Sequence, residues 1–144
     1  MTYITQAELE TAYGVKEIAD LADRDADGVA DAPVVAAAIE RATGLIDSHL
    51  RSRFTVPLSS TPDLVREIAL SLTRYFLADE NASERTRADH KQALVWLKEI
   101  REGKIDIGLD DTDTAVEATS GGAQFAHGGG AFDEDALNEF RWKR

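Results

Sequence analysis

The residues with the most specific chemistry lie in one short acidic stretch, residues 23–31. Its carboxylates fall at every second position, with Gly28 between the third and the fourth. Hard cations such as Ca²⁺ take oxygen ligands, and loops that bind them space those ligands in this way. The stretch therefore predicts a Ca²⁺ site whose ligands are four carboxylates and one backbone carbonyl: Asp23, Asp25, Asp27, Asp31 and, through its carbonyl, Val29.

A tight acidic turn is the competing interpretation of the same residues. Numbered from Asp23, the pattern matches a calcium-binding loop through position nine, but position twelve is Val34 instead of the usual bidentate Glu. We therefore expect weak Ca²⁺ binding at most, and no other cofactor. In the alternative, Gly28 adopts a positive φ and Asp31 caps the helix that follows.

No other group of residues predicts an active site. His49, His90 and His127 are far apart in the sequence, with His90 expected on a polar helix face, and the chain has no cysteine. No spacing resembles a metal-binding pair or a catalytic triad, and no glycine-rich phosphate loop follows a strand. No carboxylate lies in an apolar setting that would raise its pKa for acid–base work. We expect a protein that is not an enzyme.

Length and charge limit the other function classes. The chain has 144 residues, 43% of them hydrophobic, which suits one domain with a core. Its net charge of −11 disfavours binding to nucleic acid, which needs clustered Lys and Arg. The charge is −6 over residues 1–33, balanced over 34–109 and −5 over 110–144. The apolar runs are too short for a membrane span, and the N-terminus has no signal-peptide pattern, so we expect no membrane partner.

Helix signals predict a mainly α fold over residues 1–109. Thr5 and Glu8 form a capping box before a short helix that ends at Gly14, and a second short helix follows over residues 16–21. Three long helices come next: from Pro33 to about residue 50, after Thr61 and Pro62 to residues 77–79, and from Ser83 or Thr86 to about residue 101. The expected architecture is a small bundle of these three with the short N-terminal helices and an extended C-terminal arm.

The last long helix carries the one basic concentration in the chain. Its inward positions are predicted to be Ala88, Leu94, Val95, Leu97 and Ile100. Its exposed face is predicted to carry Arg85, Arg87, Lys91, Lys98 and Arg101. Such a face is either simply solvated or a contact for the acidic ends of a neighbouring copy.

The amino-acid composition of the chain changes after the last long helix. Ile105, Ile107 and Leu109 alternate with polar or small residues, which predicts a short strand or an extended arm. Residues 110–131 are acidic and then glycine-rich, and cannot bury enough surface to fold alone. Apolar residues then return, at positions typical of a docking peptide on a tether: Phe132, Leu137, Phe140 and Trp142. We expect a helical connector domain over 1–109 and a flexible acidic, glycine-rich arm over 110–144.

Several stretches together resemble one known family. They are Tyr-Ile-Thr-Gln-Ala-Glu-Leu at 3–9, the acidic stretch with its preceding residues at 21–31, and Ile-Asp-Ser-His-Leu-Arg-Ser-Arg-Phe at 46–54 with Val-Pro-Leu at 56–58. The helical segments 68–77 and 93–104 continue the match, which spans about residues 3–109. In these stretches the chain resembles the small virion protein of Mu-like phages and prophages.

This resemblance implies a structural protein with no catalytic residue. Such proteins are mostly helical head–tail connectors, or adaptors, that form a ring, commonly of twelve, below the portal. The implied partners are the portal protein, neighbouring copies and a stopper or tail-completion protein, while genomic DNA passes through without specific binding. The implied location is the head–tail junction of the virion, after synthesis in the host bacterial cytoplasm. Two alternatives stay open: another neck or tail-completion position, and a calcium-responsive helical binding protein that uses residues 23–31.

Overall fold

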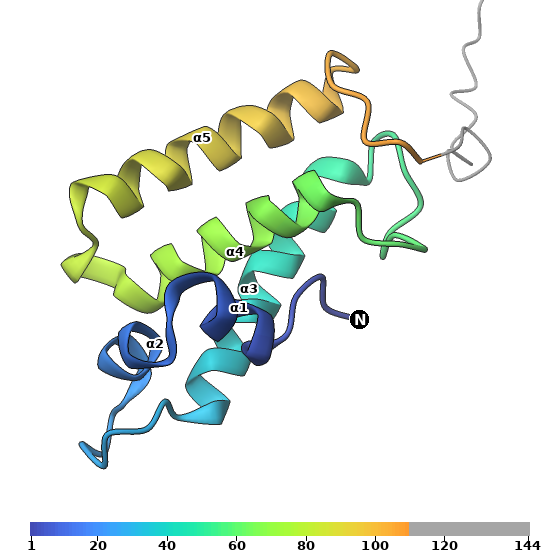
Figure 1. The fold of residues 1–144 in the computed structure, drawn as a ribbon. Coiled ribbons are helices and arrows are strands. Elements are labelled where there is room, and N and C mark those ends of the chain that lie inside the picture. The colour runs from blue at the N-terminus through green and yellow to red at the C-terminus, as the bar shows by residue number, and fades with distance from the viewer. Residues whose placement is uncertain (110–144) are drawn as a thin grey trace, which may run out of the picture.

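A computed structural model describes residues 1–109, and these residues form a small helical bundle that contains no strand (Figure 1). Two short helices, α1 (Gln6–Tyr13) and α2 (Val15–Ala22), precede three long ones. The long helices are α3 (Ala32–Leu50), α4 (Asp63–Ala78) and α5 (Glu84–Arg101), and a 3₁₀ turn, η1 (Asp79–Asn81), joins the last two. The predicted mainly α bundle is confirmed.

Helix α4 is the centre of the bundle. It packs most extensively against α3 and α5, and it also contacts α1 and α2. Nine of its sixteen residues are buried, which fits its central position. The buried Thr73 is satisfied locally, because its hydroxyl donates to the Ala69 carbonyl at 2.7 Å.

Of the four helix caps that the sequence predicts, at Thr5, Asp31, Thr61 and Ser83 or Thr86, two form the capping hydrogen bond. The Thr5 hydroxyl accepts from the Glu8 N–H and Glu8 Oε2 accepts from the Thr5 N–H at 2.8 Å, so the capping box is present. The Ser83 hydroxyl accepts from the Thr86 N–H at 3.1 Å, so Ser83 is the cap of α5. The prediction for α4 was wrong: Pro62 itself occupies the cap position, and no side chain caps the helix.

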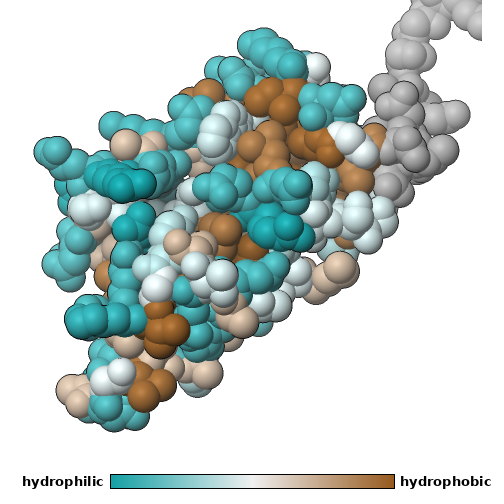
Figure 2. Space-filling view, viewed as in Figure 1, coloured by the Kyte–Doolittle hydropathy of each residue, from teal (hydrophilic) through white to brown (hydrophobic). Residues whose placement is uncertain are grey.

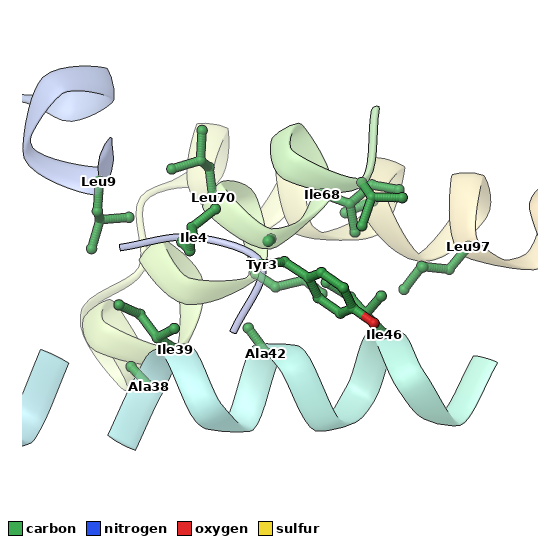
Figure 3. Close-up of a cluster of buried hydrophobic side chains, with 14 of the residues drawn as sticks. Tyr3, Ile4, Leu9, Ala38, Ile39, Ala42, Ile46, Ile68, Leu70 and Leu97 are labelled. Atoms are coloured by element: carbon green, nitrogen blue, oxygen red, sulfur yellow. The ribbon is translucent and has the colours of Figure 1, made fainter. Parts of the chain in front are cut away.

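The N-terminal segment is part of the core. Figure 3 shows Tyr3 and Ile4 between α3 and α4, close to Ala42 and Ile46. The buried Tyr3 hydroxyl donates to the Asp47 carboxylate and accepts from the Leu58 N–H at 3.2 Å. Burial, with the Asp47 hydrogen bond, raises the pKa of Tyr3 well above its usual range. Tyr3 therefore fixes the chain start to α3 and to the linker that follows it.

Helix α5 is rotated relative to the prediction. Ala88 is exposed and the Val95 side chain is 47% exposed, so their inward assignment was wrong. His90, predicted on a polar face, is half-buried and stacks on Tyr75 with ring centroids 3.8 Å apart. The fully inward positions of α5 are Thr86, Ala93, Leu97 and Ile100.

The segment after α5 forms no strand and consists of turns and irregular chain. Ile107 is buried in the core, and Ile105 and Leu109 pack partly buried against it. Arg53, from the turn after α3, donates to the Ile100 carbonyl and so ties the end of α5 to that turn. The alternating pattern reflects a chain lying on the bundle, because within residues 1–109 no neighbouring strand is present for it to pair with.

Candidate interaction surfaces

The acidic stretch at 23–31, here called the Asp loop, joins α2 to α3 as a tight turn at one end of the molecule (Figure 1). Its carboxylates accept hydrogen bonds from its own backbone: Asp23 from the Gly28 N–H at 2.8 Å, and Asp27 from the Val29 N–H at 2.8 Å. Gly28 has a φ of 86°, as the turn interpretation requires. Side chains thus satisfy the loop's N–H groups, which accounts for its Asp content without any ion.

Three of the predicted calcium ligands also lie together. Asp23, Asp25 and Asp27 each place a carboxylate oxygen within 4.8 Å of the others. The charge of Asp27 raises the pKa of Asp25, whereas the hydrogen bond from Gly28 lowers that of Asp23. These three oxygens could hold a hard cation, which would relieve the repulsion between them.

The remaining members of the predicted ligand set do not join this group. Asp31 Oδ2 accepts from the Arg24 N–H at 2.7 Å and lies outside the cluster. Asp31 occupies the cap position of α3, but its side chain makes no capping hydrogen bond, so that prediction was wrong. Val29 is 64% exposed, and Val34, at the twelfth loop position, packs partly buried against the core. The closure that a twelfth-position Glu provides is therefore missing.

The predicted basic face of α5 divides into two parts. Four cations follow one exposed stripe at spacings of four, seven and three residues, here called the basic stripe: Arg87, Lys91, Lys98 and Arg101. Arg85 is exposed on another side of the helix, where it lines a groove with Asp89 and Trp96. A helix that turns 100° per residue places residues two apart on different faces, so Arg85 does not share a surface with Arg87.

That groove, of about 380 Å³, centres on a residue that the sequence interpretation missed, Arg74. The Arg74 side chain is 16% exposed, and its Nε donates to Glu17 of α2 at 2.7 Å. Its guanidinium also lies 4.5 Å from the Tyr13 ring centroid and 3.8 Å from an Asp89 oxygen. Arg74 of α4 therefore links α1, α2 and α5. The available signal was a cation next to the apolar stripe of a core helix, since a buried charge needs partners.

The surface toward the end of the described chain is more apolar. The face in Figure 2 is largely hydrophilic, and hydrophobic residues gather close to the point where residue 109 leaves the bundle. The predicted docking residues of the arm lie outside the described residues: Phe132, Leu137, Phe140 and Trp142. Within residues 1–109, no helix combines the length and the apolar character that crossing a membrane requires.

Comparison with known proteins matches the chain to one family of phage proteins. The family described as Bacteriophage Mu, Gp36 matches residues 3–126. The Mu-like prophage FluMu protein gp36 of Haemophilus influenzae is 29% identical over 119 residues, which cover 83% of this chain and 84% of that protein. Gene product J of Escherichia phage Mu is 28% identical over 116 residues, 80% of this chain and 82% of that protein.

The extent of this match corrects one expectation and confirms another. The resemblance in the sequence ended near residue 109, whereas the family match continues to residue 126 and so includes the first half of the arm. The remaining residues, 127–144, lie outside it. Since the match covers most of the chain, this protein belongs to the Bacteriophage Mu, Gp36 family, as its resemblance to proteins of Mu-like phages and prophages implied.

Proposed function

We propose that this protein is a structural adaptor at the head–tail junction of a Mu-like phage. Copies of the chain form a ring below the portal protein and hold a stopper or tail-completion protein on the other side. Membership in the Mu Gp36 family supports a phage role, and a small bundle with charged surfaces suits a subunit built for assembly. The protein is made in the host cytoplasm and ends in the virion.

The observation that carries this proposal is the separation of two surfaces of opposite charge. The basic stripe runs along α5, and the Asp loop projects from the opposite side of the bundle (Figure 1). Residues 1–33, which include the Asp loop, carry a net charge of −6. A head-to-tail ring needs two unlike surfaces on each subunit, and opposite charges steer such surfaces together.

The overall charge suits the passage of DNA. A channel for packaged DNA must not hold the duplex, and a net charge of −11 per chain opposes contact with phosphates. The cations of the basic stripe are then engaged by neighbouring subunits, away from the duplex. In this arrangement the genome passes through the ring without specific binding.

Lys91→Glu is expected to prevent ring formation while leaving the subunit folded. Lys91 is exposed in the basic stripe and makes no ion pair within residues 1–109, so its replacement removes no ion pair from the folded subunit. In a ring, the glutamate at position 91 would face acidic residues of the neighbouring copy and be repelled by them. We therefore expect at least a tenfold loss of ring assembly. Electron microscopy of capsid-bound rings measures the result.

Arg51→Glu is the matched control, because Arg51 is also exposed and the charge change is the same. It lies just past the end of α3 and is not one of the four cations of the basic stripe. If Lys91→Glu assembles as well as Arg51→Glu, the basic stripe is not the subunit contact.

A calcium-responsive binding protein is the second candidate, supported by the cluster of Asp23, Asp25 and Asp27. Without a bidentate ligand at Val34, we expect calorimetry of the purified full chain to give a Ca²⁺ dissociation constant of about a millimolar or weaker. Circular dichroism is expected to stay unchanged, and Asp25→Asn to remove the binding heat, with Asp20→Asn as the control on α2. Sub-millimolar binding with a conformational change would favour this second function over the adaptor.

A further inference from the structure

An apolar groove lies between the N-terminal half of α3 and the C-terminal end of α4. It encloses about 390 Å³, within the size range of pockets that hold small ligands or large side chains. Its apolar walls include Pro33, Val34 and Ala37 from α3 and Phe76 and Leu77 from α4. Pro33 and Ala37 are exposed, so the groove is open to a partner.

The groove already holds one cation on an aromatic ring. The Arg41 guanidinium lies 4.2 Å from the centroid of the half-buried Phe76 ring. Contacts of this kind are favourable because the ring face carries partial negative charge. An occupant with alternating aromatic and cationic side chains can extend the same stack.

Carboxylates are adjacent in the sequence to residues that line the groove. Arg24, which lines it, belongs to the Asp loop. Asp79 and Glu80, both exposed, come directly after the end of α4, whose Leu77 lines the groove. The Asp loop and this turn together carry six carboxylates, whereas the groove lining holds two arginines: Asp23, Asp25, Asp27, Asp31, Asp79 and Glu80, against Arg24 and Arg41. The surroundings favour a cationic occupant.

One segment of this chain outside the described residues has the matching composition. Residues 140–144, here called the terminal segment, read Phe-Arg-Trp-Lys-Arg: two aromatic residues and three cations in five positions. Residues 110–139 carry eight acids and no base, so they do not compete for an acidic surface. Aromatic residues and arginine are also the types that most often anchor interfaces.

The geometry points to a second copy as the source of this segment. We propose that the groove between α3 and α4 receives the terminal segment of a neighbouring copy. The helix ends that line the groove, the N-terminal half of α3 and the C-terminal end of α4, lie at the other end of the bundle from residue 109 (Figure 1). A contact between two copies would therefore join them end to end. Thirty residues, 110–139, separate residue 109 from the terminal segment, and a chain of that length can extend to at most about 100 Å, enough to reach a neighbour. Head-to-tail contacts between copies can close into rings. This inference therefore rests on the proposed adaptor function.

Paired cysteines test the contact in the full chain, which has no cysteine of its own. Ala37→Cys places a thiol on the exposed groove wall, and Asn138→Cys places one next to the terminal segment. In the double variant we expect mild oxidation to yield a ladder of disulfide-linked oligomers on a non-reducing gel. Adding Phe140→Ala and Trp142→Ala should reduce the ladder about tenfold or more, because the anchors are lost.

The control pairs Asn138→Cys with Ala88→Cys, since Ala88 is equally small and exposed but lies on α5. An equal ladder from the control, or no ladder from the groove pair, would overturn the inference. A disulfide-closed monomer would show that the segment occupies its own subunit and would overturn the assignment to a second copy. The gel assay uses purified protein alone, so the absence of a disulfide ladder would not contradict the adaptor function. Failure of ring assembly on the portal with the ladder intact would instead count against the adaptor.

Discussion

Deletion of residues 128–144 is expected to leave a folded helical monomer that no longer assembles on the portal. All the buried hydrophobic residues of the described core lie between Tyr3 and Ile107, so the deletion removes none of that core. It does remove Phe132, Leu137, Phe140 and Trp142, the aromatic and aliphatic residues that interfaces favour as anchors. We expect an unchanged helical circular dichroism spectrum and loss of the protein from purified particles.

A deletion of equal length tests whether the anchors or merely the length of the arm matter. Removing residues 110–126 also takes out seventeen residues but keeps the docking residues. If the remaining arm is long enough to reach its docking site, the variant lacking residues 110–126 assembles on the portal, whereas the variant lacking residues 128–144 does not. Capsid-bound rings formed by the protein that lacks 128–144 would rule out the docking role of the arm. The anchors lie beyond residue 126, where the family match ends.

The second large effect is a difference in the free energy of unfolding between substitutions at two positions of α5, Leu97 and Val95. Leu97 has no exposed surface, whereas the Val95 side chain is 47% exposed. Leu97→Ala should lower the free energy of unfolding by about 2–5 kcal/mol, because it removes buried surface and leaves a cavity in the core. Val95→Ala should change it by about 0.5 kcal/mol or less, since exposed substitutions cost little and Ala favours a helix.

Urea unfolding of the full chain, followed by circular dichroism, measures both changes. Val95→Ala serves as the matched control because it lies on the same helix and also truncates an aliphatic side chain. Similar losses for the two variants would contradict the rotation of α5 in this fold. A small loss for Leu97→Ala alone would indicate that the core collapses to fill the cavity.

Much of the fold could be predicted because local signals agree with one another. The capping box at Thr5, the serine cap at Ser83 and the apolar stripes of α3 and α4 each depend on residues a few positions apart. Such signals need no tertiary contact, since caps satisfy the free N–H groups of one helix and stripes follow the helical repeat. The Asp loop is local in the same way: its carboxylates accept hydrogen bonds from N–H groups within the loop.

Predictions failed where the local sequence allowed a residue more than one role. Alternation at Ile105 and Ile107 is common to strands and to extended chain lying on a core, and only the absence of a neighbouring strand in residues 1–109 distinguishes them. Asp31 was predicted to cap α3, but the Arg24 N–H takes its carboxylate instead. In both cases the local sequence allowed two structures of similar energy, and packing selected one.

Residue types at short spacing were enough to predict the helices, their order and the family resemblance. For the Asp loop the same spacing left a Ca²⁺ site and a tight turn as alternatives. Tertiary packing set the orientation of α5 about its own axis, which exposes Val95. It alone brought Arg74 to Glu17 and Tyr13 and opened the groove beside Phe76. The reason is physical: a helix with apolar residues on more than one side can bury several faces, and the shapes of the neighbouring helices determine which face is buried.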